Sequence, residues 1–159
     1  MAGFDALTHD WKPLVPELIV SDLGVSLRFW RDLLGFEVLY ERPAEGFAYL
    51  AREGAEVMLE VLGDSSWTVG VMERPFGRGI NLQIEARSLT GMLDALAKAQ
   101  WPLYRQPEER WYRVGAMEAG QRQFVVQDPD GYLLRFAQGL GSRPASIPSD
   151  VRGTPPRSG

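Results

Sequence analysis

The stretch LIVSDLGVSLRFWRDLLGFEV, Leu18 to Val38, encodes a strand, a helix and the start of a second strand. Its first residues form a short apolar extended run, and Ser21-Asp22 follows, a pair whose side-chain oxygens can cap a helix. Apolar residues then recur at helical spacing. They are Val25, Phe29, Trp30, Leu33 and Leu34. Gly35 suits the left-handed position that ends a helix, so the stretch predicts a β-strand and an α-helix leading into another strand.

The same order of elements occurs twice along the chain. Strand-like runs follow the first helix at 36–41, 47–52 and 56–61, and the short turns between them predict an antiparallel meander. An extended run at 80–86 then leads to a second helix, which Ser88 can cap and Trp101-Pro102 stops. Further extended segments lie at 103–106, 111–114, 121–127 and 132–137. The sequence therefore predicts an α+β fold of two βαβββ modules. Inward-facing aromatic residues are expected in the core, namely Phe29, Trp30, Phe36, Phe124 and Phe136.

Composition divides the chain into a central domain and two flanking segments. We expect module one at 13–62, a Gly-rich, Trp-bearing linker at 63–79 and module two at 80–138. Residues 1–12 form a weakly patterned N-terminal extension, from which Trp11 could dock onto the core. Residues 139–159 hold four Gly, four Pro and four Ser. Such a tail buries too little apolar area to offset its ordering entropy, so we expect it to be disordered.

The composition also limits the available chemistry. The 159 residues carry 17 Lys+Arg against 21 Asp+Glu, a formal charge of −4, one histidine and no cysteine. A disulfide framework, a cysteine zinc site and a multi-histidine metal cage are therefore excluded.

The charges form no basic stripe for nucleic acid. No apolar run reaches the roughly 18 residues of a membrane span, and the N-terminus does not resemble a signal peptide. We expect a cytoplasmic protein without nucleic-acid or membrane partners, and we interpret His9 as an incidental surface residue.

Two motifs and the repeated module carry a resemblance to a known family. The motifs are LIVSDLGVSLRFWRDLLGFEV (18–38) and QFVVQDPDGYLLRF (123–136). Together they resemble the vicinal oxygen chelate superfamily, which includes glyoxalase I, extradiol dioxygenases, and fosfomycin- and bleomycin-resistance proteins. The resemblance implies that each module curls its mixed sheet into half a barrel. The helices would cover the convex side, and the functional pocket would lie on the concave side.

Strand alternation indicates which side chains line the concave face. In the run 56–62, the apolar residues at 57, 59 and 61 suit packing under a helix, so Met58 and Glu60 point the other way. The same parity in the other strands adds Glu17, Tyr49, Asn81, Gln83 and Arg135. Trp67 and Trp111 join these candidate ligand-binding residues, because they lie in the linker or near a loop and offer flat surfaces for stacking. For each strand residue, a solvated strand face is the alternative.

The resemblance also assigns the positions at which metal-dependent members hold their ion. In this sequence they are approximately Val15 or Glu17, Glu60, Gly79 or Asn81, and Arg135. Only Glu60 is a clear ligand, and a guanidinium has no acceptor atom for a cation. We therefore expect no metal, no other cofactor and no catalytic residue. We hypothesise that Arg135 replaces the charge of the metal and pairs with Glu60, within one chain or across a dimer.

The bleomycin-resistance branch, which is metal-free and sequesters large cationic, aromatic drugs in the clefts of a homodimer, is the most similar in sequence pattern. The resemblance implies a homodimeric, non-catalytic small-molecule binding protein of the antibiotic-resistance type. Glu17 and Glu60 would attract a cationic or aromatic ligand. Gly120 stands where drug-binding members carry a tryptophan, and Arg135 adds positive charge, so a smaller or partly anionic ligand fits equally well. An enzyme of the superfamily, a glyoxalase-like lyase or dioxygenase relative with a degenerate metal site, is the alternative. A module that has lost its ligand is the third.

Overall fold

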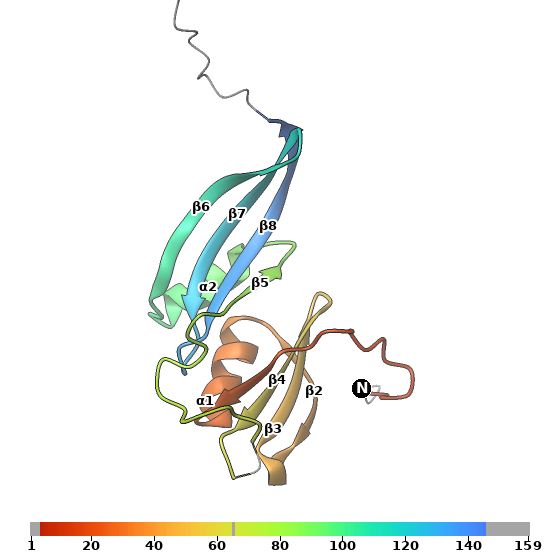
Figure 1. The fold of residues 1–159 in the computed structure, drawn as a ribbon, viewed down its shortest axis with the longest axis vertical. Coiled ribbons are helices and arrows are strands. Elements are labelled where there is room, and N and C mark those ends of the chain that lie inside the picture. Colours follow the sequence, from red (N-terminus) through yellow and green to blue (C-terminus); the bar gives the residue numbers. More distant parts are fainter. Residues whose placement is uncertain (1–3, 65, 146–159) are drawn as a thin grey trace, which may run out of the picture.

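Two mixed four-stranded sheets, each with one α-helix, make up the fold (Figure 1). The structure is a computed structural model, and it describes residues 4–64 and 66–145. Module one consists of β1 (Glu17–Val20), α1 (Leu23–Leu27), β2 (Glu37–Arg42), β3 (Phe47–Arg52) and β4 (Ala55–Val61). Module two consists of β5 (Asn81–Glu85), α2 (Thr90–Lys98), β6 (Leu103–Val114), β7 (Met117–Gln127) and β8 (Leu133–Pro144). The predicted α+β fold of two βαβββ modules is confirmed.

Both sheets have the same topology. The strand order is β1-β4-β3-β2 in module one and β5-β8-β7-β6 in module two. The first strand of each module therefore pairs in parallel with the last, while the other pairs are antiparallel. A parallel pair needs a crossover connection, which the helix begins, whereas short turns suffice for antiparallel neighbours. One face of each sheet thus packs under its own module's helix and the other face is left for a site.

The first helix is built in two parts. Asp22 Oδ1 accepts a hydrogen bond from Val25 N at 2.8 Å, so Asp22 is the cap. The backbone then continues as a π-helical turn, Arg28–Leu33, and Gly35 follows with a φ of 73°. A π turn holds an extra residue and so rotates the buried stripe relative to an α-helix. Trp30 is therefore fully buried as expected, whereas Val25 at the start of the predicted stripe is exposed.

One hydrophobic core extends through both modules. The predicted core aromatics Phe29, Trp30, Phe36, Phe124 and Phe136 are all buried within it. The ring centroids of Phe29 and Trp101 lie 4.8 Å apart, and Trp30 Nε1 donates a hydrogen bond to Asp128 Oδ2 at 3.4 Å. The helix that follows β1 therefore packs against module two, and the two sheets lie one beyond the other along the long axis (Figure 1).

The Asp128–Tyr132 turn joins the modules. Asp128 Oδ1 accepts hydrogen bonds from three successive backbone N–H groups, those of Asp130, Gly131 and Tyr132, at 2.8 to 3.0 Å. Asp130 Oδ2 accepts from Ser21 N at 3.0 Å, and Tyr132 Oη donates to the carbonyl of Ile19 at 3.0 Å. Gly131 has a φ of 101°, and a Cβ there would lie 2.4 Å from Pro75. Both the backbone conformation and the close approach therefore require glycine.

Strand β6 is one element where the sequence predicted two. The predicted segments 103–106 and 111–114 join through Pro107, and the expected surface turn at Glu108-Glu109 is part of the strand. Two register shifts accommodate the interruption, one on each side of residue 105. Strand β6 lies at the sheet edge, and edge strands and bulges are where a proline without an N–H is tolerated.

Part of the segment that was predicted to be a disordered tail is ordered. Strand β8 continues past the predicted boundary at 138 to Pro144, and Arg143 pairs with Glu118 of β7. Arg143 Nε donates to Glu118 Oε2 at 2.8 Å, which adds an ion pair to the backbone ladder. A long partner strand thus orders a Gly-containing segment that could not fold alone. The rest of the predicted tail, residues 146–159, lies outside the described residues.

Candidate functional site

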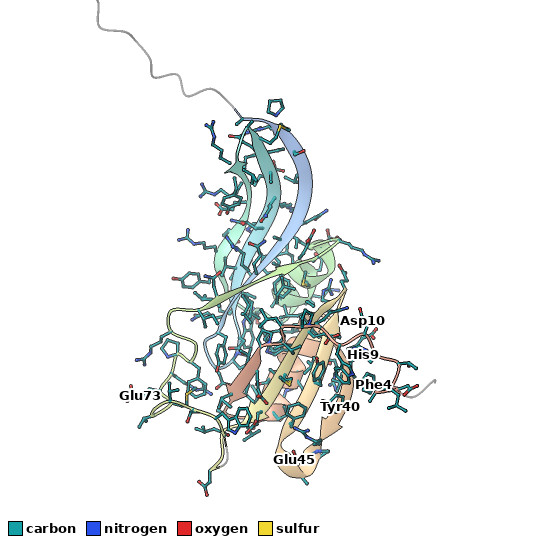
Figure 2. The ribbon with its side chains drawn as sticks, turned by 45° about the vertical axis from the view of Figure 1, so that its right-hand side comes forward. Phe4, His9, Asp10, Tyr40, Glu45 and Glu73 are labelled. Carbon is teal, nitrogen blue, oxygen red and sulfur yellow. The ribbon has the colours of Figure 1, made fainter. Side chains whose placement is uncertain are left out.

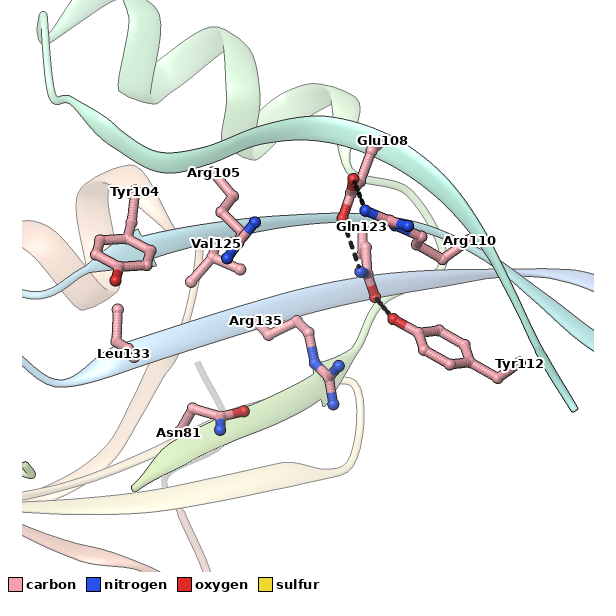
Figure 3. Close-up of a pocket in the computed structure, with 10 residues that line it drawn as sticks. All are labelled: Asn81, Tyr104, Arg105, Glu108, Arg110, Tyr112, Gln123, Val125, Leu133 and Arg135. Atoms are coloured by element: carbon pink, nitrogen blue, oxygen red, sulfur yellow. Dashed lines mark hydrogen bonds and ion pairs between the residues drawn. The ribbon is translucent and has the colours of Figure 1, made fainter. Parts of the chain in front are cut away.

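Five of the nine candidate ligand-binding residues line two cavities, one on each sheet. The first, which we call the acidic cavity, has a volume of about 560 Å³. It is lined by Glu17, Arg42, Ala44, Glu45, Phe47, Glu60 and Trp67. The second, which we call the basic cavity, has a volume of about 540 Å³. It is lined by Asn81, Tyr104, Arg105, Glu108, Arg110, Tyr112, Gln123, Val125, Leu133 and Arg135 (Figure 3). The structure brings Glu17, Glu60 and Trp67 together, and separately Asn81 and Arg135.

Three carboxylates and one guanidinium line the acidic cavity. Desolvation raises the pKa of Glu17 above its usual value, and the neighbouring Glu60 raises it further. Glu60 Oε1 accepts a hydrogen bond from Ser66 Oγ at 2.9 Å. Arg42 is occupied, because its Nε lies 2.8 Å from Glu45 Oε2 and its guanidinium lies 3.9 Å from the centre of the Phe47 ring. The uncompensated charge at this cavity is therefore negative.

Trp67 forms the outer rim of the acidic cavity. Its side chain is 94% exposed, although the cavity includes it. When a flat or cationic ligand stacks on so exposed an indole, the apolar surface of the ring is removed from water, and this favours binding. The role of Trp67 as a stacking surface stays a prediction.

The basic cavity has the opposite balance, with three guanidinium groups and one carboxylate. Glu108 Oε2 lies 3.0 Å from Arg110 Nη2, and this hydrogen-bonded pair lowers the pKa of Glu108. Gln123 Nε2 donates to Glu108 Oε1 at 3.2 Å, and Tyr112 Oη donates to Gln123 Oε1 at 3.1 Å. Figure 3 shows this chain of contacts along one side of the cavity. It fixes Glu108 and Arg110 against each other, and the other two arginines form no ion pair with any residue that the structure describes.

An N-terminal segment covers part of the concave face of module one. Phe4 stacks on Tyr40 with centroids 5.5 Å apart (Figure 2), and Trp11 packs edge-on to Tyr49 at 5.3 Å. Tyr49 is only 3% exposed as a result, so its ring is not available to a ligand in this conformation. Trp11 thus contacts Tyr49 on the concave face of module one and does not join the hydrophobic core onto which docking was predicted.

Glu56 anchors that segment. Its carboxylate accepts a hydrogen bond from Tyr49 Oη at 2.5 Å and lies 2.8 Å from His9 Nε2. Burial raises the pKa of Glu56, but the contacts with Tyr49, His9 and the Lys12 N–H outweigh burial and hold it below its usual value. His9 is therefore not an incidental surface residue, which corrects the prediction. No sequence signal pointed to this contact, because the two residues are 47 positions apart.

The other predicted residues lie on these faces with one exception. Met58 sits in register between Glu17 and Tyr49, and Gln83 is paired with Arg135 on the concave face of module two. The exception is Trp111, which pairs with Gly120 on β7. Gly120 and the buried Phe124 are an even number of residues apart, so they face the same side of the sheet. Trp111 therefore lies on the face opposite the basic cavity. Arg143 stacks on the Trp111 ring at 3.9 Å. A Cβ at Gly120 would lie 2.6 Å from that ring, which explains the glycine.

The four positions at which the family holds a metal do not fit one here. Glu17 and Glu60 belong to the sheet of module one, whereas Asn81 and Arg135 belong to that of module two. Arg135 supplies five donors and no acceptor, so it opposes rather than coordinates a cation. Within residues 4–64 and 66–145, no group of three or more His, Asp or Glu side chains is arranged to hold a metal ion. No chemical step can therefore be assigned to a metal at this site.

The hypothesised Glu60–Arg135 pair is not formed within one chain. The Glu60 carboxylate contacts Ser66, and no ion pair of Arg135 occurs among the described residues. The two side chains belong to different cavities on different sheets. The form of the hypothesis that joins them across a dimer stays a prediction.

Comparisons with known sequences and structures identify the family to which the chain belongs. The chain belongs to the Glyoxalase/Bleomycin resistance protein/Dioxygenase superfamily, whose family model matches residues 12–136. No curated protein sequence matches the chain significantly. A crystal structure of a superfamily member from Vibrio splendidus 12B01 is 39% identical, covers 78% of this chain and 95% of that chain, and has a TM-score of 0.37.

Two further solved structures share the fold at lower identity. TioX from Micromonospora sp. ML1 is 21% identical, covers 82% of this chain and 100% of that chain, and has a TM-score of 0.61. A bleomycin resistance determinant encoded on the transposon Tn5 is 17% identical over 82% of this chain and 99% of that chain, with a TM-score of 0.55. Among the residues that the structure describes, no helix is long and apolar enough to cross a membrane.

Proposed function

We propose that the protein is a metal-independent small-molecule binding protein of the bleomycin-resistance type, which sequesters its ligand in a cleft on the concave sheet faces. The cleft forms in a homodimer, where the acidic cavity of one protomer meets the basic cavity of its partner. A cytoplasmic location is part of the same proposal. The alternative, a superfamily enzyme with a degenerate metal site, has weaker support because Arg135 occupies a ligand position.

One observation carries the proposal. The two cavities are of similar size, opposite in charge and each lined by only one half of the fold, the acidic one completed by Trp67 of the linker. Each cavity taken alone, which we call a half-site, contacts a ligand from one side only. Small-molecule sites normally bury most of the surface of their ligand. Opposite charges also attract the two half-sites to each other, which favours joining an acidic cavity to a basic one. A two-fold dimer joined in this way contains two equivalent clefts.

The oligomeric state tests the first part of the proposal. We expect sedimentation equilibrium to give a dimer at micromolar concentration, and we expect dissociation to increase with salt because the facing charges are screened. Glu60→Gln removes one of the facing carboxylates and should weaken the dimer, while Glu73→Gln in the exposed linker should leave it unchanged. A salt-independent monomer would contradict the proposed cleft.

A thermal-shift screen tests the binding function. Antibiotics and aromatic metabolites of either charge are screened, since a ligand that binds only the folded state raises the midpoint by mass action. At least one class should raise the midpoint of the wild type, and the shift should change in Glu60→Gln and Arg135→Ala. Elemental analysis of the purified protein accompanies the screen. Stoichiometric Fe, Mn, Ni or Zn that is lost in Glu60→Gln would favour the enzyme alternative instead.

A further inference from the structure

Two arginines lie in one row across the sheet of module two. Arg105 on β6 pairs with Val125 on β7, and Val125 pairs with Arg135 on β8. Residues directly opposite each other in adjacent strands point to the same face of a sheet. Both guanidinium groups therefore project from the concave face on either side of Val125, as Figure 3 shows. Neighbouring strands are about 4.8 Å apart, so the two Cα atoms are separated by about 10 Å.

Within the described part of its own chain, neither arginine is neutralised by a carboxylate. Within residues 4–64 and 66–145, no carboxylate lies within ion-pair distance of Arg105 or Arg135. The carboxylate that lines the same cavity, Glu108, is already held by Arg110 and Gln123. Beside the Glu108–Arg110 pair, the cavity thus presents two positive charges without a partner in the described part of their own chain, among amide, phenol and apolar groups.

The guanidinium of Arg135 shows a second sign of an incomplete site. Its Nε atom is buried and has no hydrogen-bond partner among the described residues. A buried donor without an acceptor is costly, and such groups in folded proteins are normally satisfied. The same guanidinium lines the basic cavity, so an acceptor that binds there meets its terminal N–H groups first. Asn81, in the adjacent strand β5, lines the cavity beside Arg135 and could donate a further hydrogen bond to the same acceptor (Figure 3).

We propose that Arg105 and Arg135 together bind an oxyanion, the carboxylate or phosphate group of a small organic acid, on the concave face of module two. A guanidinium matches the geometry of both groups, because its N–H donors form a planar fork that binds two oxygens at once. Val125, Leu133 and Tyr104 provide an apolar and aromatic wall for the organic part of the acid. This inference rests on the proposed binding function, and it assigns the ligand its charge.

The test measures binding of three probes of matched size. Benzoate, phenylphosphate and benzylammonium are titrated at fixed ionic strength into the dimer, and inorganic phosphate is added as a fourth probe without a ring. Arg105→Gln and Arg135→Gln remove one guanidinium each. Arg122→Gln is the matched control, because Arg122 lies on β7 but points to the opposite face, as its parity with Phe124 shows. Circular dichroism confirms that each variant is folded.

We expect the two aromatic anions to bind and benzylammonium not to bind at the basic cavity. Each of the two variants should weaken anion binding about tenfold, as the loss of one charge-assisted hydrogen bond predicts, while the control is unchanged. Titration of the wild type should also shift the NMR signal of the Arg135 Nε–H. Comparison of benzoate with phenylphosphate shows whether the site prefers a carboxylate or a phosphate. The affinity for phenylphosphate should rise with pH near 6, because the phosphate gains its second negative charge there.

Three outcomes would overturn the inference. If benzylammonium binds as well as benzoate and both arginine variants retain that binding, the ligand is not recognised by its negative charge, while the proposed binding function stands. If Arg135→Gln dissociates the dimer but leaves anion affinity unchanged, Arg135 belongs to the dimer interface. If none of the four probes binds at 10 millimolar while the broader screen finds a ligand, the inference alone is wrong. A broader screen without any ligand would instead contradict the proposed function.

Discussion

The two modules have the same order of strands and helix, yet their concave faces differ in charge and in covering. Module one presents carboxylates beside Trp67, and its N-terminal segment covers Tyr49. Module two presents arginines beside amide and phenol groups, and no segment between residues 4 and 145 that the structure describes pairs with Arg105 or Arg135 through a carboxylate. The backbone pattern depends on convex residues that pack under the helices, and these are apolar in both modules. Concave residues carry no such constraint, so the same fold can support two half-sites of opposite charge.

The largest expected effect concerns the turn that joins the modules. Asp128→Ala removes the acceptor of three backbone N–H groups and of Trp30 Nε1 in a buried position. We expect the free energy of unfolding to fall by about 3 kcal/mol, because several buried donors lose their partner at once. Chemical denaturation measures the change. Asp32→Ala, which removes a surface ion pair with Arg31, should cost less than about 0.5 kcal/mol. Similar values for the two variants would show that the modules do not depend on this turn.

The pH dependence of the same carboxyl group gives a second test. Burial, with a further contribution from the charge of Asp130, raises the pKa of Asp128 to about 6. A folded pKa above the unfolded value means that the folded state binds the proton more tightly, so this group's contribution to stability falls as pH rises from about 4 to about 6. The full change is about 3 kcal/mol at 1.36 kcal/mol per pKa unit. Carboxyl carbon NMR should show Asp128 titrating near 6, and a midpoint near 4 would contradict the assignment.

Glu56 in module one should respond to pH in the opposite direction. Its pKa is lowered in the fold, so its contribution to stability is present above the unfolded value and is lost as pH falls through the folded value. Glu56→Gln should therefore cost about 1 to 2 kcal/mol at pH 7, because the Tyr49 and His9 contacts weaken. The difference from the wild type should shrink at low pH, where Glu56 is protonated. Glu37→Gln, on the exposed start of β2, is the control and should cost little at either pH.

The two tryptophans give the smallest but most selective comparison. Trp111→Ala should lower stability by about 1 kcal/mol through the loss of the Arg143 contact, without changing ligand binding. Trp67→Ala should leave stability unchanged and weaken binding of an aromatic ligand about tenfold, since one stacking platform is lost. Denaturation curves and titration with a ligand from the screen measure both. If Trp111→Ala weakened binding and Trp67→Ala did not, the acidic cavity would not be part of the ligand site.

Local patterns predicted most of the fold because each element depends on near neighbours in sequence. The capped helix after Asp22, the meander of module one and the Asp128–Gly131 turn all appear where expected. Strand β6 was divided wrongly because Pro107 resembles a turn, and only pairing with β7 shows that the strand continues through two register shifts. Arg105 and Glu108 were missed for the same reason. A bulge changes which face a residue occupies, and alternation in a single strand cannot reveal it.

The sequence by itself determined the two βαβββ modules, the convex core, and most of the concave residues, since apolar periodicity and turn residues act locally. It also determined that Arg135 cannot coordinate a cation, because that depends only on residue type. Only the tertiary structure decided that Glu60 and Arg135 lie in separate cavities, that Trp111 lies on the opposite face, and that His9 reaches Glu56. These facts depend on contacts between residues far apart in the chain, which long-range packing creates and local patterns do not encode.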